Sequence, residues 1–343
     1  YYNDKKELRR RIFSSVESIV SSLIKGDKGK IVKKKIKIII ILMLLVISVG
    51  CTKTLKDNKN IVTYEKTGQS LTANILCQPE EDDLYNLYKE YDNKLSTKID
   101  DLPKCKSFTP SKIKYESLWE SLFVKPLAYI ILKFGYLIKN MGLSVMIIGL
   151  IIRIIMLPIQ IKTVKQSENM KKAQPEIARI EKKYQNRTDN ESLMAKSQET
   201  MMVYKKYSLN PVSGCLLTFL QLPLFFAFLE AINRVPAIFE GTFLSMNLGM
   251  TPATGIGNKN YLYVILVILI ILTTYISFKN SMKSQEQTSE MAQQMKMMSI
   301  FMIFMISIAS LSLPTAIALY WIVTNGFAVV QNIIIKKIIE KRK

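Results

Sequence analysis

Long apolar runs, separated by charged stretches, dominate the second half of the chain. Five of them approach or reach the length of a membrane span, at residues 142–157, 212–232, 261–278, 297–309 and 315–335. A helix needs about 20 mostly apolar residues to cross the hydrocarbon core of a bilayer. The last two runs together are too long for one crossing, and Pro314 divides them because proline lacks a backbone N–H. The pattern predicts an all-α polytopic membrane protein with five transmembrane helices within residues 141–335.

Residues 116–140 carry a different pattern, in which apolar residues recur at a spacing of three to four. Glu120, Lys125 and Lys133 interrupt the apolar positions. This periodicity is typical of an amphipathic helix that lies in the membrane interface. The alternative is a further transmembrane span, which would place the lysine-rich segment after Pro158 outside the cell, against the usual distribution of charge.

Segment 159–211 is polar and rich in lysine. Two helical stretches, 162–184 and 191–207, flank turn residues at 186–190, so a helical hairpin is predicted. Neither stretch has a continuous apolar stripe, which favours a mobile hairpin that contacts water, lipid headgroups or a partner. A passive solvated connector is the alternative. Positive residues mark cytoplasmic segments, so this hairpin and the basic tail 336–343 are predicted to be cytoplasmic.

The opposite face of the membrane is predicted for loop 233–260, which carries only two positive residues, Arg234 and Lys259. Residues 51–115 are expected on the same side. This segment is polar, lacks a periodic core pattern and is predicted to be an extracytoplasmic tether with helix at 80–92. Cys77 and Cys105 could form a disulfide there or remain free thiols, and the sequence leaves both possibilities open.

A basic stretch at 33–37 and a short apolar run at 38–50 have the features of a signal sequence. The run ends Ser48-Val-Gly-Cys51, which resembles a bacterial lipobox, although Ser48 stands where leucine is usual. We expect that residues 1–50 are removed and that Cys51 is lipidated. The alternative is an uncleaved anchor helix with an unmodified cysteine. Residues 1–30 are expected to be upstream read-through, with translation beginning near Ile31 or Val32.

Composition excludes most soluble and enzymatic classes. The chain is 49% hydrophobic and carries a net charge of +21, which in a membrane protein first sets topology and then favours anionic lipids rather than DNA. It has no histidine, and its four cysteines have no metal-ligand spacing. The sequence holds no phosphate-binding loop and no nucleophile elbow. We therefore expect no catalytic residues, no metal and no cofactor, and hence not an enzyme.

Arg153 is a lone cation inside the apolar run 142–157. A positive charge at the centre of a lipid-exposed helix costs ~2.5–3.5 kcal/mol on insertion scales. Such a residue either faces a polar cavity or, being five residues before Pro158, extends to the lipid headgroups. The run alone does not separate the two interpretations.

Three stretches resemble the YidC branch of the YidC/Oxa/Alb insertase family. They are 157–184, 210–228 (Asn-Pro-Val-Ser-Gly-Cys-Leu-Leu-Thr-Phe-Leu-Gln-Leu-Pro and onward), and 318–325 (Ala-Leu-Tyr-Trp-Ile-Val-Thr-Asn) followed by Gln331. The resemblance covers roughly residues 115–340 in order. The lipobox and the five-span core resemble the shorter Gram-positive form of the family, in which tether 51–115 has no counterpart that we can place.

The resemblance implies an insertase and chaperone that moves hydrophobic segments of nascent proteins from the cytoplasm into the bilayer, alone or beside the Sec translocon. It also implies a hydrophilic groove that is open to the cytoplasm and the lipid and closed to the outside. Arg153 matches the family's groove arginine. Gln221, Tyr320, Trp321 and Asn325 are further groove candidates, and for Gln221, Tyr320 and Trp321 ordinary bonding or packing between helices is the alternative.

The implied location is the plasma membrane of a bacterium, with a lipid-anchored N-terminus outside and the C-terminus in the cytoplasm. The basic tail could contact ribosomal RNA or anionic lipid. A small-solute transporter or channel is the main alternative function. It predicts several intramembrane charges and repeated halves, whereas the sequence shows one lone arginine and no inverted repeat.

Overall fold

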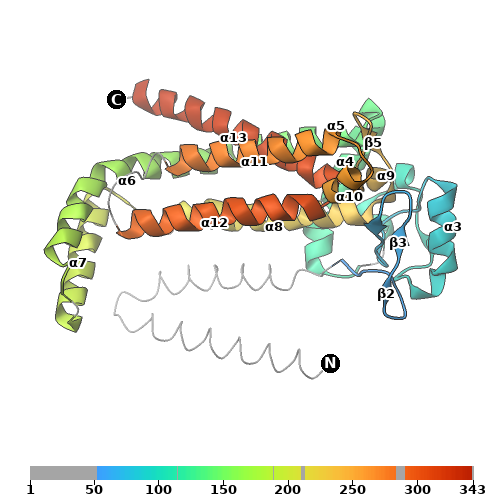
Figure 1. Ribbon diagram of the computed structural model, residues 1–343, viewed down its shortest axis with the longest axis horizontal. Coiled ribbons are helices and arrows are strands. Elements are labelled where there is room, and N and C mark those ends of the chain that lie inside the picture. Colours follow the sequence, from blue (N-terminus) through green and yellow to red (C-terminus); the bar gives the residue numbers. More distant parts are fainter. Residues whose placement is uncertain (1–51, 114, 188, 210–212, 283–289, 342–343) are drawn as a thin grey trace. The chain divides into compact units, whose positions relative to one another are not determined.

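The computed structural model describes residues 52–113, 115–187, 189–209, 213–282 and 290–341 (Figure 1). The predicted leader 1–50, the lipidation candidate Cys51 and the last two tail residues lie outside the described residues. Helices make up most of the described chain, and three short β-hairpins accompany them. The longer helices are α3 (Asp82–Glu90), α4 (Lys125–Ile138), α5 (Met141–Ile155), α6 (Leu157–Lys183), α7 (Asn190–Lys206), α8 (Ser213–Arg234), α11 (Leu262–Met282), α12 (Glu290–Ser312) and α13 (Thr315–Lys341).

Residues 52–113 form a small folded unit, which we call the disulfide domain. It contains α3, four short 3-10 turns and two antiparallel hairpins, β1–β2 (Lys56–Asp57 and Asn60–Ile61) and β3–β4 (Thr63–Tyr64 and Gln69–Ser70). Its core consists of Leu55, Val62, Tyr64, Leu71, Ala73, Ile75, Leu84, Tyr88, Ile99 and Leu102, joined by Phe239 from a distant part of the chain. The helix predicted at 80–92 is confirmed. The expectation of a tether without a core is wrong, because the buried residues come from turns and two-residue strands that are too short to show a periodicity.

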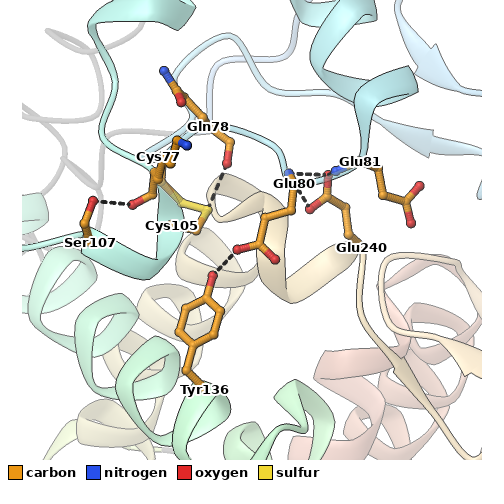
Figure 2. Close-up of a disulfide and its surroundings, with 9 residues drawn as sticks. Cys77, Gln78, Glu80, Glu81, Cys105, Ser107, Tyr136 and Glu240 are labelled. Atoms are coloured by element: carbon orange, nitrogen blue, oxygen red, sulfur yellow. Dashed lines mark hydrogen bonds between the residues drawn. A yellow bond between two sulfur atoms is a disulfide. The ribbon is translucent and has the colours of Figure 1, made fainter.

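A disulfide joins Cys77 to Cys105 across a sequence separation of 28 residues. Next to it, the Glu240 carboxylate accepts hydrogen bonds from the backbone N–H groups of Glu80 and Glu81 at 3.1 Å, and the Tyr136 hydroxyl donates to the Glu80 carboxylate (Figure 2). Glu240 follows α9 (Pro236–Phe239), and Tyr136 belongs to α4. The start of α3 is therefore bound to two helices of the rest of the protein.

Burial raises the pKa of the Glu240 carboxyl to about 7 from the ordinary 4.5. The carboxylates of Glu81 and Glu80 act in the same direction, while the two backbone N–H bonds lower the pKa. Glu240 thus exchanges a proton near neutral pH while it holds the start of α3.

The predicted amphipathic segment 116–140 is helical from the π-helical turn η5 (Glu120–Val124) through α4. Helix α4 ends at Lys139, which adopts a left-handed conformation with φ of 55°, and α5 begins after the Asn140 cap. The two helices pack against each other, and the Ser144 hydroxyl donates to the Ile131 carbonyl at 2.7 Å. The interfacial placement of this segment stays a prediction.

Each of the five predicted spans coincides with a helix, namely α5, α8, α11, α12 and α13. The break at Pro314 is confirmed, because α12 ends at Ser312 and α13 begins at Thr315. The Thr315 backbone N–H and hydroxyl both donate to the Met250 carbonyl, at 3.0 and 2.7 Å. The turn between α12 and α13 is thereby bound to the loop that contains α10 (Pro252–Gly257) and the hairpin β5–β6 (Thr242–Phe243 and Met246–Asn247).

Within the part of the chain that the structure describes, three helical stretches have the length and hydropathy of a membrane span: Glu120–Ile138, Leu262–Asn280 and Thr315–Ile339. Helices α5 and α6 meet the same criteria as a pair bent by 59°, which raises the number to four. Helix α12 adds the shorter apolar stretch Ser299–Ser312. An all-helical membrane protein with three or four candidate spans is supported, and the count of five stays a prediction.

Helices α6 and α7 form the predicted hairpin, and its helices are packed together. Ala173, Ile177, Ile180, Tyr184, Val203, Tyr204 and Leu209 make a buried cluster between them. Lys206 pairs with Glu176 and Lys183 with Glu199, both at 2.6 Å. A short run of apolar residues on each helix therefore suffices for packing without a stripe along the whole length, and the mobility of the hairpin stays a prediction.

Removal of the disulfide by the double substitution Cys77→Ser and Cys105→Ser should destabilise the disulfide domain by about 3 kcal/mol, because a closed loop of this length restricts the unfolded chain. Limited proteolysis of the full chain in detergent measures the effect as faster cleavage within residues 52–113. Cys215→Ser is the matched control and should leave the cleavage rate unchanged. Equal cleavage of the double variant and the wild type would contradict the expectation.

Glu240 should make the protein less stable as pH rises from about 4.5 to about 7. The unfolded chain releases this proton near its ordinary pKa, whereas the folded protein keeps it to about 7, so the stabilisation is present at low pH and is lost across this interval. Thermal unfolding of wild type and Glu240→Gln at about pH 5 and about pH 8 measures the difference. The variant should show a smaller fall in Tm. An equal fall in both proteins would argue against titration of Glu240.

Candidate functional site

Three of the five groove candidates lie on α13. Tyr320, Trp321 and Asn325 occupy its first three turns, where the helix contacts α5, α8 and α11. The Thr324 hydroxyl donates back to the Tyr320 carbonyl at 2.7 Å, which satisfies this polar group inside an apolar helix. Gly149 of α5 allows a close approach, since a Cβ there would lie 2.9 Å from the Tyr320 ring.

Tyr320 joins α13 to α8 by two contacts. The Gln221 side-chain amide donates to the Tyr320 hydroxyl at 3.0 Å, and the Tyr320 ring stacks on Phe228 with a centroid distance of 4.2 Å. Tyr320 is only 1% exposed, so its ring presents almost no free surface in this conformation. The structure thus brings Gln221 and Tyr320 together, as part of the packing between two helices.

Trp321 and Asn325 make separate contacts. Trp321 stacks on Phe225 of α8 with a centroid distance of 5.3 Å and nearly parallel rings. The Asn325 amide donates to the Thr274 hydroxyl of α11 at 3.1 Å. Both residues are half-buried, so each keeps some accessible surface.

Arg153 lies in the last turn of α5, where a cation interacts favourably with the helix dipole. Its side chain is half-buried and lies one turn after Gly149, the α5 position that meets the Tyr320 ring. Among the described residues, none provides a hydrogen-bond acceptor for the buried Nε atom of Arg153. The Gln331 amide donates instead to the Arg153 backbone carbonyl at 3.3 Å.

Of the five groove candidates, Gln221 and Tyr320 contact each other directly. Arg153, Trp321 and Asn325 make separate contacts. Gln221 and Tyr320 link α8 and α13 through a hydrogen bond, and Gly149 brings α5 against the same Tyr320 ring one turn before Arg153. The buried Nε donor of Arg153 can bind an acceptor from a ligand at little cost, because the guanidinium loses no bond when it does so. In the described part of the chain, no group of three or more His, Cys, Asp or Glu side chains could hold a metal ion.

A second polar cluster, at the end of α8 next to the disulfide domain, has no counterpart in the sequence analysis. We call it the Arg234 cluster, and it consists of Glu116, Glu120, Lys125, Glu230 and Arg234. Arg234 contacts Glu120 at 2.6 Å, Glu230 at 3.6 Å and Glu116 at 3.7 Å. Lys125 lies 3.8 Å from Glu120.

Four members of the Arg234 cluster are almost fully buried, since Arg234, Glu120 and Lys125 are each 2% exposed and Glu230 is 4% exposed, whereas Glu116 is exposed. The Trp119 indole N–H donates to Glu230 at 3.1 Å, which supplies a further bond. In the sequence, Arg234 stands out only as a loop charge and Glu120 only as an interruption of an apolar pattern. Acidic and basic residues at the ends of apolar helices were the available signal, but nothing in the sequence paired them.

Comparisons with known proteins cover the helical part of the chain. A family model described as 60Kd inner membrane protein matches residues 133–342. The chain is 33% identical to the membrane protein insertase YidC of Oceanobacillus iheyensis over 223 residues, which are 65% of this chain and 85% of that protein. It is 36% identical to the membrane protein insertase YidC 2 of Bacillus anthracis over 228 residues, 66% of this chain and 84% of that protein. The membrane protein insertase MisCA of Bacillus subtilis is 33% identical over 180 residues, 52% and 64% of the two chains.

Two substitutions of Tyr320 distinguish the contribution of its hydroxyl to stability from that of its ring. Tyr320→Phe loses the bond from Gln221 and should lower the free energy of unfolding by about 0.5–1 kcal/mol, as for other bonds between membrane helices. Tyr320→Ala also loses the stacking on Phe228 and leaves a cavity, and should cost about 3–5 kcal/mol. Thermal unfolding in detergent measures both values. Equal losses for the two variants would show that the ring adds nothing to the packing.

Proposed function

The chain belongs to the 60Kd inner membrane protein family, and we propose that it is a membrane protein insertase that moves hydrophobic segments of nascent proteins from the cytoplasm into the bilayer. One observation supports a site for this activity within the matched region. Arg153 has a buried Nε donor without an acceptor among the described residues, and it lies one turn after Gly149, which meets the ring of Tyr320, the partner of Gln221. We propose that Arg153, Gln221, Tyr320, Trp321 and Asn325 belong to a hydrophilic groove.

The groove would lower the barrier that a polar segment meets when it leaves water. An unsatisfied backbone or side-chain polar group costs several kcal/mol in hydrocarbon, so a polar surface within the membrane offers it temporary partners. Arg153 would attract acidic residues of the incoming extracellular tail, and this attraction is stronger at low dielectric than in water. Gln221 and Asn325 would offer amide groups to the passing chain.

Release into lipid supplies the driving force. Burial of about 20 apolar residues from water into hydrocarbon is strongly favourable, so the hydrophobic span slides into the membrane while its polar tail leaves to the outside. The short apolar stretch Ser299–Ser312 of α12 would thin the bilayer locally and shorten the polar segment's path. This mechanism needs no nucleotide, cofactor or covalent step, so we propose a chaperone rather than an enzyme.

The proposed topology has five crossings, formed by α5, α8, α11, α12 and α13, with residues 116–140 in the interface. The lysine-rich hairpin α6–α7 and the tail 336–343 would face the cytoplasm. The disulfide domain and loop 233–260 would lie outside, and the Cys77–Cys105 bond supports this because disulfides persist in oxidising compartments.

Nascent membrane proteins are the proposed substrates in a bacterial plasma membrane. The Sec translocon and the ribosome are proposed partners, and anionic lipids would contact the basic tail. Lipidation of Cys51 would anchor the outer N-terminus. The relatives' names favour an insertase over the alternative of a small-solute transporter.

Depletion of the protein should reduce insertion of a small single-span substrate with an acidic outer tail, and wild type should restore it. Arg153→Ala should insert this substrate about fivefold less well, and Arg153→Lys should retain most of the activity, because attraction by a cation at low dielectric is lost only in the first. Protease protection of the substrate's tail measures insertion. Lys162→Ala removes an exposed lysine beyond the end of α5 and should behave as wild type.

Two results would count against the proposal, and each of them contradicts a different part of it. Normal insertion in depleted cells would remove the insertase function for this substrate. Full complementation by Arg153→Ala would remove the charge-attraction step and leave the groove as a polar surface.

A further inference from the structure

The segment before residue 133, which the family model does not match, is joined to the matched core at the end of α8. The Arg234 side chain donates from Nε to the Asn74 carbonyl of the disulfide domain at 2.7 Å. The backbone adds two bonds, from the Leu76 N–H to the Arg234 carbonyl at 2.8 Å and from the Thr72 hydroxyl to the Asn233 carbonyl at 3.1 Å. The disulfide domain therefore meets the core at Arg234.

Arg234 binds three separate parts of the chain with one guanidinium. Its Nε contacts the disulfide domain, one terminal nitrogen contacts Glu120 of η5 at 2.6 Å, and the other lies 3.6 Å from Glu230 of α8. A planar guanidinium offers donors in several fixed directions, which a lysine ammonium cannot reproduce. Without Arg234, the buried carboxylates of Glu120 and Glu230 would lose the positive charge that both of them contact.

We propose that Arg234 is a positioning residue that fixes the disulfide domain and η5 over the end of α8 and thereby keeps the groove closed at its outer end. This inference rests on the proposed insertase function and topology. Helix α8 carries the effect to the groove, because Gln221, Phe225 and Phe228 on the same helix contact Tyr320 and Trp321. Gln221 precedes Arg234 by thirteen positions, which corresponds to about 20 Å of helix, and Phe225 and Phe228 lie on the Arg234 side of Pro223, the proline inside α8.

The test measures access to the cluster from outside. Ala231 is fully buried one turn before Arg234, and Ala231→Cys provides a reporter for a thiol reagent that does not cross membranes. Intact cells carrying the full chain are treated with the reagent, and labelling of the same chain without the added cysteine is subtracted. Lys259→Cys, at an exposed position of the same loop, is labelled in every background and reports the amount of protein at the surface.

In the Ala231→Cys background, Arg234→Gln should be labelled at least about tenfold faster than the parent, because a carboxylate left without its buried partner favours opening of the contact. Arg234→Lys should fall between the two. Arg234→Gln combined with Glu120→Gln should recover protection to within about threefold of the parent, since a pair of buried amides avoids the uncompensated charge. Recovery by a second substitution distinguishes positioning by charge from a general loss of structure.

The same variants are assayed for insertion in depleted cells. Arg234→Gln should insert the substrate several-fold less well, and the double variant should regain activity together with protection. Lys259→Gln, which removes an exposed positive charge from the same loop, should match wild type in both measurements.

Unchanged labelling of Arg234→Gln would overturn the proposal, as would a double variant that is labelled as fast as Arg234→Gln. Faster labelling with unchanged insertion would also overturn it, since closure would then have no bearing on the activity. If Arg234→Gln does not reach the membrane, Arg234→Lys and the double variant carry the same test. Failure of wild type to restore insertion would refute the proposed function instead, and the labelling results would still report on closure.

Discussion

A polar group that is buried in a membrane protein must find its partner inside the protein, because hydrocarbon offers none. Two arginines in this structure differ in how far they meet that requirement. Arg234 is surrounded by three carboxylates and a backbone carbonyl within 3.7 Å. Arg153 keeps a buried Nε atom for which the described residues provide no acceptor. A fully compensated charge holds segments together, whereas an uncompensated one remains available to a passing chain.

Helix α8 connects the Arg234 cluster to the residues that we propose for the groove. At one end it carries Glu230 and Arg234 in the buried cluster, and along its length Gln221, Phe225 and Phe228 contact α13. The part of α8 after Pro223 carries Phe225, Phe228, Glu230 and Arg234, and its internal backbone bonds can transmit a displacement of one end to the other. The packing of α8 at the disulfide domain therefore constrains the surface that we propose as the groove.

Hydrophobic pattern predicted the helices well, since each span carries its own signal in consecutive residues. It located the five apolar helices, the break at Pro314, α3 and the α6–α7 hairpin. It missed the core of the disulfide domain, whose residues come from short strands and turns, and the Arg234 cluster, whose members lie up to 118 positions apart, from Glu116 to Arg234. Contacts between distant residues leave no periodicity in one sequence. The Gln221–Tyr320 bond is of the kind that the sequence offered as the alternative role of Gln221, a bond between helices, but nothing in the sequence paired the two residues.

The disulfide domain is attached to the helical core by charged contacts as well as by apolar burial. Its core is small and takes in Phe239 from the loop after α8, so part of its stability comes from the protein to which it attaches. A domain of this size buries too little apolar surface to be strongly stable alone, and a disulfide is a usual compensation. Apolar contacts tolerate sliding, whereas a guanidinium fork bound to carboxylates on two helices fixes one orientation. The Arg234 cluster thus fixes the orientation of the disulfide domain on the helical core. The shared apolar core and the disulfide stabilise the attachment.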